Sequence, residues 1–416
     1  MSAYTEYKPC EGDWIKAIPS TWEIIRGKYL FKIKKRIVGE VGHDVLSITQ
    51  KGIKVKDTES GDGQLSMDYS KYQIVEPGDF AMNHMDLLTG YVDISKYKGV
   101  TSPDYRVFTP NESEHSPRYF LYLFQMGYTN KIFFKYGQGA SHLGRWRLPT
   151  EEFNNFYFPC PPSEEQQQIA NFLDHETAKI DTLIDKQQQL ISLLKEKRQA
   201  EISHTVTKGL NPDAPMRDSG VEWLGEVPAH WEVVRLKFLA RLQTDKVTIG
   251  NKKTIALENI ESWTGQYTPT NSNYTGEDVE FTKGDILFGK LRPYLAKVYQ
   301  ANNRGVAFGD LLVYRPKSTL FSKYCFYQML NEQFINTVDS STYGSKMPRA
   351  SAEFISNMQL LLPPLEEQIK ITSHIDLLLK KYEGIESKAK SAIKLMQERR
   401  TALISAAVTG KIDVRN

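Results

Sequence analysis

Several features that mark secreted, membrane or disulfide-bonded proteins are scarce or missing in this sequence of 416 residues. The three cysteines, Cys10, Cys160 and Cys325, are widely spaced and follow no zinc or disulfide pattern. No run approaches the roughly 18 apolar residues of a membrane helix, and the N-terminal segment has no apolar core of signal-peptide length. We therefore expect a cytoplasmic protein that has no membrane segment.

Motifs for catalysis are also missing. Gly284–Leu291 nearly spells a phosphate-binding loop but has leucine where the Mg²⁺-binding hydroxyl belongs. No methyltransferase motif occurs, and Pro103-Asp104 lacks the Glu-x-Lys that completes a restriction-nuclease site. The eight histidines follow no metal-ligand spacing. We expect no catalytic residue, metal or cofactor in this chain. A nuclease or methyltransferase with an unrecognised site remains an alternative, which purified protein with cofactor and no partner would test.

The composition is that of a soluble globular protein, with 40% hydrophobic and 25% charged residues. The length allows two or three domains. A net charge of +3 neither indicates nor excludes a nucleic-acid partner, because the distribution of charge matters more than its sum.

The most informative feature is a long segment that occurs twice, as Pro161–Gly209 and Pro363–Lys411. A constant offset of 202 residues aligns the copies without a gap, and 18 of 49 paired positions are identical. Chance would give roughly three identities at average composition. The chain therefore contains an internal duplication.

Each copy is predicted to form one long helix. Paired prolines end the preceding extended segment, and Ser163 with Gln166 forms a capping-box pattern, whereas the second copy has Leu365 at the cap position. Apolar residues recur in steps of three and four, as in a coiled coil. The predicted seam consists of Ile169, Leu173, Ile180, Leu183, Leu190 and Leu194 in the first copy, and Ile371, Ile375, Leu378, Tyr382, Ile385, Ala389, Ala392 and Met396 in the second.

The length of these helices favours a spacer in which the two copies pack on each other. At 1.5 Å per residue each would span about 65–70 Å, far more than a globular core needs. The other interpretation is two amphipathic helices, each buried against its own domain.

The duplication extends into the regions before the helices. Trp14–Phe31 matches Trp223–Ala240, Val75–Met82 matches Phe281–Phe288 through a shared Gly-Asp, and Asp104–Pro110 matches Asp310–Pro316. A Gly-Asp between alternating apolar residues is typical of a turn that leads into a strand. We predict an α+β protein with a mixed α/β domain over 1–160, a helix over 161–209, a linker over 210–222, a second domain over 223–362 and a second helix over 363–411.

The loops between the matched segments differ between the two halves and are basic. Lysine and arginine mixed with tyrosine, tryptophan, asparagine and glutamine suit phosphate contacts and base-edge readout, although solvated surface is the alternative for any single residue. The predicted DNA-contacting residues are Lys34, Lys35, Arg36, Lys51, Lys54, Ser141, His142 and Arg145 in the first domain, and Lys252, Lys253, Lys290, Arg292, Tyr294, Lys346 and Arg349 in the second. The sequence does not say which of them reach bases.

The order of the matched motifs resembles type I restriction–modification specificity subunits over nearly the whole chain. The motifs are IPSTWEIIRGKYLF, PPSEEQQQIANFLD, NPDAPMRDSGVEWLGEVPAHWEVVRLKFL, LLPPLEEQIKI and RRTALISAAVTGKI. The resemblance implies two DNA target-recognition domains, each followed by a conserved spacer helix, with the helices packed antiparallel. Each domain would read one half of a bipartite, asymmetric DNA sequence. Readers on one face of DNA lie about 34–36 Å apart, a separation that such helices can set.

The resemblance also implies partners. In that family the specificity subunit has no active site and recruits two modification subunits, which bind S-adenosylmethionine and methylate adenine, together with restriction subunits that use ATP and Mg²⁺. The helices and the matched N-terminal segments would dock the modification subunits. Two alternatives remain: a coiled-coil adaptor between proteins that lacks sequence-specific DNA binding, and a specificity subunit that serves a methyltransferase without a restriction partner.

Overall fold

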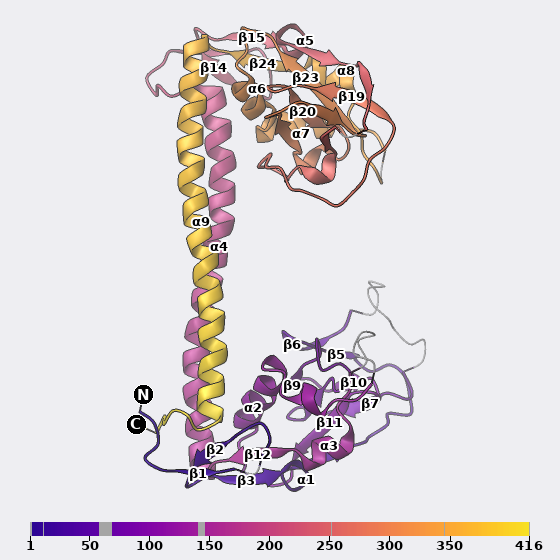
Figure 1. The fold of residues 1–416 in the computed structure, drawn as a ribbon, viewed down its shortest axis with the longest axis vertical. Helices are drawn as coiled ribbons and strands as arrows, with labels where there is room; N and C mark the ends of the chain where they lie inside the picture. The colour runs from indigo at the N-terminus through magenta and orange to yellow at the C-terminus, as the bar shows by residue number, and fades with distance from the viewer. Residues whose placement is uncertain are drawn as a thin grey trace. The chain divides into compact units, whose positions relative to one another are not determined.

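Two compact units make up the chain in the computed structural model, which describes residues 2–10, 12–57, 69–139, 146–250, 252–344 and 346–415 (Figure 1). Unit 1 comprises Met1–Lys186 and Ser391–Asn416, and unit 2 comprises Gln187–Lys390. The boundaries fall inside the two long helices, α4 (Ser163–Lys208) and α9 (Leu365–Val408). Each unit therefore holds one α/β domain, the start of one long helix and the end of the other.

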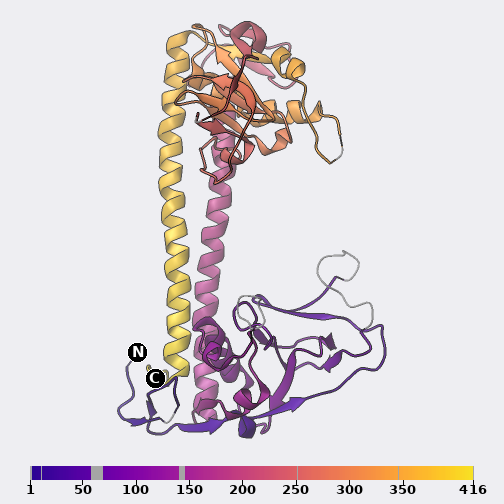
Figure 2. The same cartoon turned by 45° about the vertical axis from the view of Figure 1, so that its right-hand side comes forward.

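Unit 1 is built on a four-stranded antiparallel sheet in the order β4-β11-β8-β9 (Figures 1 and 2). As the sequence predicts, the Gly-Asp pair forms the turn before β8: Gly78 has φ +91°, and the Asp79 carboxylate accepts a 2.8 Å hydrogen bond from the Glu76 N–H. The strands are β1 (Tyr7–Pro9), β2 (Ala17–Pro19), β3 (Glu23–Arg26), β4 (Phe31–Lys34), β5 (Leu46–Thr49), β6 (Gly52–Val55), β7 (Gln73–Val75), β8 (Phe80–Met82), β9 (Val92–Ile94), β10 (Gly99–Thr101), β11 (Arg106–Pro110) and β12 (Tyr157–Cys160).

The core of unit 1 is rich in phenylalanine. Phe31 is 3% exposed, and its ring lies 5.2–6.2 Å, centroid to centroid, from the rings of Phe80, Phe108, Phe120, Phe124, Phe153 and Phe158. Helix α2 lies between the sheet and the start of α4 (Figure 1). The shorter helices are α1 (Gly27–Leu30), α2 (Pro117–Thr129), α3 (Thr150–Asn155) and the 3-10 turn η1 (Phe133–Tyr136).

Unit 2 repeats this sheet in the order β16-β23-β20-β21 and adds a second four-stranded sheet, β17-β19-β22-β18. Its Gly-Asp pair forms the same turn, with Gly284 at φ +93° and the Asp285 carboxylate accepting from the Thr282 N–H at 2.7 Å. The elements are β13 (Met216–Asp218), β14 (Glu226–Pro228), β15 (Glu232–Arg235), α5 (Leu236–Leu239), β16 (Ala240–Gln243), β17 (Lys246–Thr248), β18 (Thr254–Ile255), η3 (Leu257–Asn259), β19 (Glu277–Phe281), β20 (Ile286–Gly289), η4 (Pro293–Leu295), β21 (Val298–Gln300), β22 (Gly305–Ala307), β23 (Leu311–Pro316), α6 (Ser322–Met329), α7 (Glu332–Ser340), α8 (Ala352–Asn357) and β24 (Gln359–Leu362).

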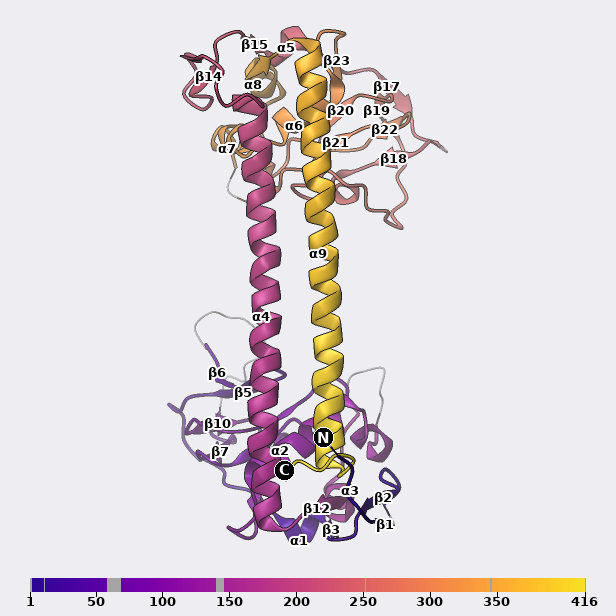
Figure 3. The ribbon, with the colours of Figure 1, turned by 90° about the vertical axis from the view of Figure 1, so that its left-hand side faces the viewer.

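Within each unit, segments of α4 and α9 run side by side in opposite directions (Figure 3). The core of unit 1 joins the first turns of α4 to the last turns of α9, through Ile169, Leu173, Ile404, Ala407 and Val408. The core of unit 2 joins the last turns of α4 to the first turns of α9, through Ile202, Val206, Ile371 and Ile375. The offset of 202 residues relates the two sets, so each unit buries the same helix positions with the helices exchanged.

A buried glutamine attaches each α/β domain to a long helix. Gln166 accepts a 3.0 Å hydrogen bond from the Ser116 N–H, and Gln368 accepts a 2.7 Å hydrogen bond from the Phe321 N–H. These donors precede α2 and α6. The two side chains of the capping box predicted for α4 have other partners: Gln166 bonds the Ser116 N–H and the Pro161 carbonyl, and the Ser163 hydroxyl donates to the Glu114 carbonyl.

A tyrosine attaches each domain to the other long helix as well. The hydroxyl of Tyr119 in α2 donates to the carbonyl of Val408 at 3.2 Å, and that of Tyr324 in α6 donates to the carbonyl of Val206, also at 3.2 Å. Each carbonyl belongs to the last turn of its helix, where no intrahelical partner is available. Each domain is thus held by both long helices of its unit.

The predicted linker 210–222 is partly regular, because β13 pairs with β14 in unit 2. Unit 1 has the corresponding hairpin at its N-terminus, where β1 pairs with β2. There the chain ends meet: the Asp413 N–H donates to the Ser2 carbonyl at 2.8 Å. The two chain termini therefore occupy the place that the continuous linker has in unit 2.

Two residues of the predicted helix seam were placed wrongly. Leu183 and Leu190 are 49% and 36% exposed, whereas Ile184 and Leu194 are 8% and 9% exposed. The buried face of α4 passes through Thr177, Ile180 and Ile184, a step of three followed by a step of four. The sequence offers an apolar residue at both 183 and 184, and 3.6 residues per turn allow either step. The other predicted seam residues are buried or half-buried, namely Ile169, Leu173, Ile180, Leu194, Ile371, Ile375, Leu378, Tyr382, Ile385, Ala389, Ala392 and Met396.

Candidate nucleic-acid interface

Five of the predicted DNA-contacting residues of unit 2 lie where three segments meet: the end of β20, the start of β23 and the segment that precedes α8. We call this place the unit 2 junction and define it by residues 290–294, 310, 343, 344 and 346–350. The predicted residues within it are Lys290, Arg292, Tyr294, Lys346 and Arg349.

One aspartate, Asp310, lies close to two of the cationic side chains of this junction. The Arg349 guanidinium bonds the Asp310 carboxylate through two N–H groups, each at 3.1 Å, and this pairing raises the pKa of Arg349. The Lys290 ammonium lies 3.7 Å from the same carboxylate. Because two cations share one carboxylate, the cluster of these three side chains keeps a net positive charge, which suits an anionic ligand.

The backbone of the junction presents Arg292 outward in an unusual conformation. Arg292 has φ +50°, a region that costs a non-glycine residue of the order of 1 kcal/mol. Its N–H donates to the Pro348 carbonyl at 2.8 Å, and its guanidinium lies 3.4 Å from the Lys346 carbonyl. Strain of this kind is often found at functional sites.

Lys252 and Lys253 precede β18, and each already has a partner. The Lys252 ammonium donates to the Thr248 carbonyl at 3.0 Å, and the Lys253 ammonium lies 4.5 Å from the centre of the Tyr267 ring. Both residues are exposed, so they stay predicted DNA contacts.

In unit 1, Lys34 ends β4 and is half-buried, and Lys35 is exposed. Arg36 is engaged inside the protein, where its guanidinium pairs with the buried Asp79 carboxylate. In unit 2 the corresponding aspartate, Asp285, also pairs with an arginine, but this arginine comes from another strand: the guanidinium of Arg315 on β23 bonds Asp285 at 2.7 and 2.8 Å. The geometry therefore gives Arg36 a structural role, and a DNA contact by it remains untested.

Lys51 and Lys54 are exposed on the β5–β6 hairpin, with Lys51 in the turn and Lys54 on β6. Ser141, His142 and Arg145 lie outside the described residues. The structure does not gather the unit 1 predictions at one junction as it does in unit 2.

Sequence reasoning left out Arg147, which holds in unit 1 the place that Arg349 holds in unit 2. The offset of 202 residues that aligns the long helices also pairs these two arginines. That offset is the signal in the sequence by which Arg147 could have been found.

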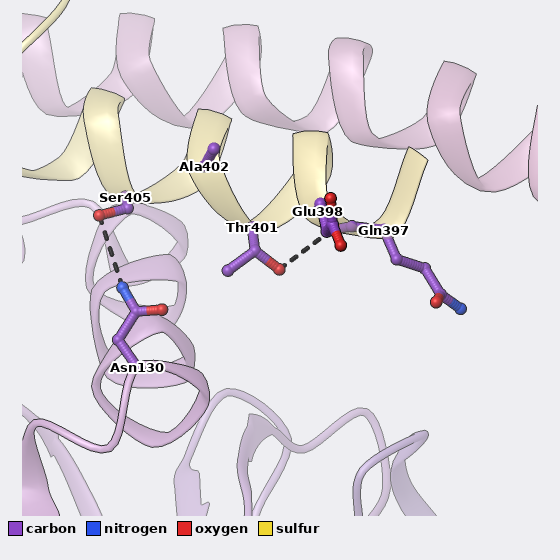
Figure 4. Close-up of a pocket in the computed structure, with 6 residues that line it drawn as sticks. All are labelled: Asn130, Gln397, Glu398, Thr401, Ala402 and Ser405. Atoms are coloured by element: carbon purple, nitrogen blue, oxygen red, sulfur yellow. Dashed lines mark hydrogen bonds between the residues drawn. The ribbon is translucent and has the colours of Figure 1, made fainter. Parts of the chain in front are cut away.

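Part of the surface of α9 forms a shallow hollow with the end of α2 (Figure 4). Asn130 follows α2, and its amide lies 3.5 Å from the Ser405 hydroxyl of α9. Unit 2 has a matching contact, in which the Ser203 hydroxyl donates to Asn331 at 3.1 Å. The hollow in unit 1 is lined by Asn130, Gln397, Glu398, Thr401, Ala402 and Ser405.

In the part of the chain that the structure describes, no three histidine, cysteine, aspartate or glutamate side chains are grouped so that they could hold a metal ion. None of the helices described is both long and apolar enough to cross a membrane.

Comparison with known proteins defines the class of this molecule. The sequence matches the type I restriction modification DNA specificity domain twice, over residues 19–192 and 228–395. It is thus a DNA specificity protein with two repeated domains. The chain belongs to the family of type I restriction–modification specificity subunits.

Individual relatives agree with this assignment. The EcoDI specificity subunit of Escherichia coli is 24% identical over 274 residues, which cover 61% of this chain and only 61% of that protein. The MjaVIII specificity subunit of Methanocaldococcus jannaschii is 24% identical over 428 residues, which cover 96% of this chain and 95% of that protein.

Two solved structures share the fold. The HsdS subunit of Thermoanaerobacter tengcongensis matches with a TM-score of 0.53, covering 95% of this chain and 98% of that one. A chain from a structure of type I R-M complex assembly and conformational transition matches with a TM-score of 0.68, covering 95% and 99%. Both are 14% identical to this chain, so they support the fold alone.

Proposed function

We propose that each unit reads one half of a bipartite, asymmetric DNA sequence and that the chain recruits methyltransferase subunits to it. One observation carries the proposal: the two units repeat the same contacts to the long helices but present different side chains at equivalent loops. Two domains that are attached to the helices in the same way, but carry different loop side chains, suit one protein that recognises two different half-sites.

The partners follow from the same comparison of the two units. Two copies of one modification subunit need two equivalent docking surfaces, and the helix contacts of the tyrosines and buried glutamines occur in both units. We propose that the long helices and the matched N-terminal segments provide these surfaces. The chain itself would bind no cofactor, with S-adenosylmethionine, ATP and Mg²⁺ belonging to modification and restriction subunits.

Methylation mapping by single-molecule sequencing tests this function. A host would carry the chain with its cognate modification subunit, and we expect an asymmetric bipartite motif with one methyladenine in each half. Binding of the modification subunit without any motif would favour the adaptor alternative. Methylation without the modification subunit would show that the chain is itself an enzyme, and adding the restriction subunit would distinguish a methyltransferase-only system.

Arg292→Ala tests the unit 2 junction. If the side chain reads a base, the variant should lose about 1–3 kcal/mol of binding free energy at the cognate site and accept other bases at one position of the second half-site. Titrations of labelled DNA at several salt concentrations would measure this. A uniform loss across sequences with a shallower salt slope would assign Arg292 to phosphate, and no change in either assay would remove it from the interface.

A further inference from the structure

Arg147 in unit 1 and Arg349 in unit 2 sit at equivalent places in the backbone. The residue after each arginine donates its N–H to a residue just beyond a central strand: Leu148 bonds the His84 carbonyl at 2.9 Å, and Ala350 bonds the Lys290 carbonyl at 2.9 Å. His84 follows β8, and Lys290 follows β20, which are corresponding strands.

The backbone of each arginine also forms an isolated antiparallel β-bridge. Arg147 exchanges N–H···O hydrogen bonds with Gln138 at 2.8 and 3.0 Å, and Arg349 exchanges them with Tyr343 at 3.3 and 3.5 Å. The elements that follow keep the offset of 202 residues, because α3 and α8, then β12 and β24, correspond residue for residue. The equivalence therefore rests on hydrogen bonds and on chain register together.

The charge environment of the two arginines differs. The Arg349 guanidinium is bound to Asp310, whereas Arg147 is exposed and forms no ion pair within the described residues. Its guanidinium is therefore not bound to a carboxylate of the described residues, unlike that of Arg349.

Buried side chains fix the backbone next to Arg147. Arg106 is 3% exposed, and its guanidinium donates to the Leu148 carbonyl at 3.1 Å and to the Thr150 hydroxyl at 3.3 Å. Burial and the nearby Arg106 and Arg147 guanidinium groups lower the pKa of His84 to about 3, so its imidazole is neutral at physiological pH. The peptide that carries Arg147 is thus held on both sides, which is what a precise base contact needs.

We propose that Arg147 is a base-reading residue of unit 1 and that its ligand is the major-groove edge of a guanine in the first half-site. The proposal rests on the function proposed above. A guanidinium presents two parallel N–H donors to the O6 and N7 acceptors of guanine, and this is the commonest specific contact between arginine and a base.

The test compares the wild-type chain with Arg147→Ala and Arg147→Gln, each carried with the modification subunit and mapped by single-molecule sequencing. Both variants should make one G·C position of the first half-site degenerate and leave the second half-site unchanged. In titrations with labelled DNA, the wild type should favour the cognate pair at that position by about 10- to 100-fold, and Arg147→Ala should abolish this preference. Lys8→Ala, which removes an exposed cation from β1, is the matched control and should leave the motif intact.

The outcomes separate this proposal from the proposed function. A wild-type chain without any bipartite motif would refute the function itself. A wild-type motif that both variants preserve would refute the role of Arg147. Uniform weakening at all sequences, with a shallower salt slope, would also refute it, because the contact would then be to phosphate. The positions of the first half-site that the variants still read report that unit 1 is folded in them.

Discussion

Phe31→Ala should lower the free energy of unfolding of unit 1 by about 3–5 kcal/mol, the usual cost of removing a fully buried phenylalanine. Its ring contacts six other phenylalanine rings, so a truncation leaves a cavity bordered by rigid side chains that cannot all move to fill it. In the matched segment of unit 2 the same position is Ala240, which is buried against different neighbours. The destabilisation should therefore be confined to unit 1.

Hydrogen exchange of the full chain, followed peptide by peptide, would measure this effect because it reports the free energy of opening for each unit. Peptides of unit 1 should lose protection while those of unit 2 keep it, and methylation should fail because the first half-site is no longer read. Tyr29→Ala is a close control: Tyr29 is 63% exposed, two residues away, and its removal should cost less than about 0.5 kcal/mol. A loss below about 1 kcal/mol for Phe31→Ala would show that this ring is not central to the core.

Gln368→Leu should destabilise unit 2 by about 3 kcal/mol. The side chain is fully buried, accepts from the Phe321 N–H and donates to the carbonyls of Thr319 and Pro363 at 3.0 and 2.9 Å. Leucine fills similar space but removes the partner of the Phe321 N–H and of the Thr319 and Pro363 carbonyls, and each of these groups that stays buried without a partner costs about 1–3 kcal/mol. The domain should also become loosely attached to α9.

The equivalent change in the other unit makes this prediction specific. Gln166→Leu should reduce hydrogen-exchange protection in unit 1 only, and Gln368→Leu in unit 2 only. Gln188→Leu makes the same substitution at an exposed position of α4 and should change neither unit. If the buried and exposed variants behaved alike, the hydrogen bonds of these glutamines would not be what attaches the domains.

The sequence by itself determined the features that local pattern controls. The two long helices follow from apolar residues at steps of three and four, and the turn before β8 or β20 follows from a Gly-Asp pair that needs a positive φ. The duplication indicated two repeated α/β domains that are each followed by a long helix, and the order of the matched motifs indicated the family. The cationic residues of the unit 2 junction could also be predicted from the sequence, because they lie in loops next to the matched strands.

Only the tertiary structure decided which side chains meet across long stretches of sequence. It turned Ile184 rather than Leu183 inward, paired Arg36 with Asp79, and turned Gln166 towards the domain instead of its own helix end. It also placed Arg147 next to the strand that ends before His84, 63 residues earlier in the chain. Such contacts depend on strand register and on packing between elements, which a local pattern of residues does not specify.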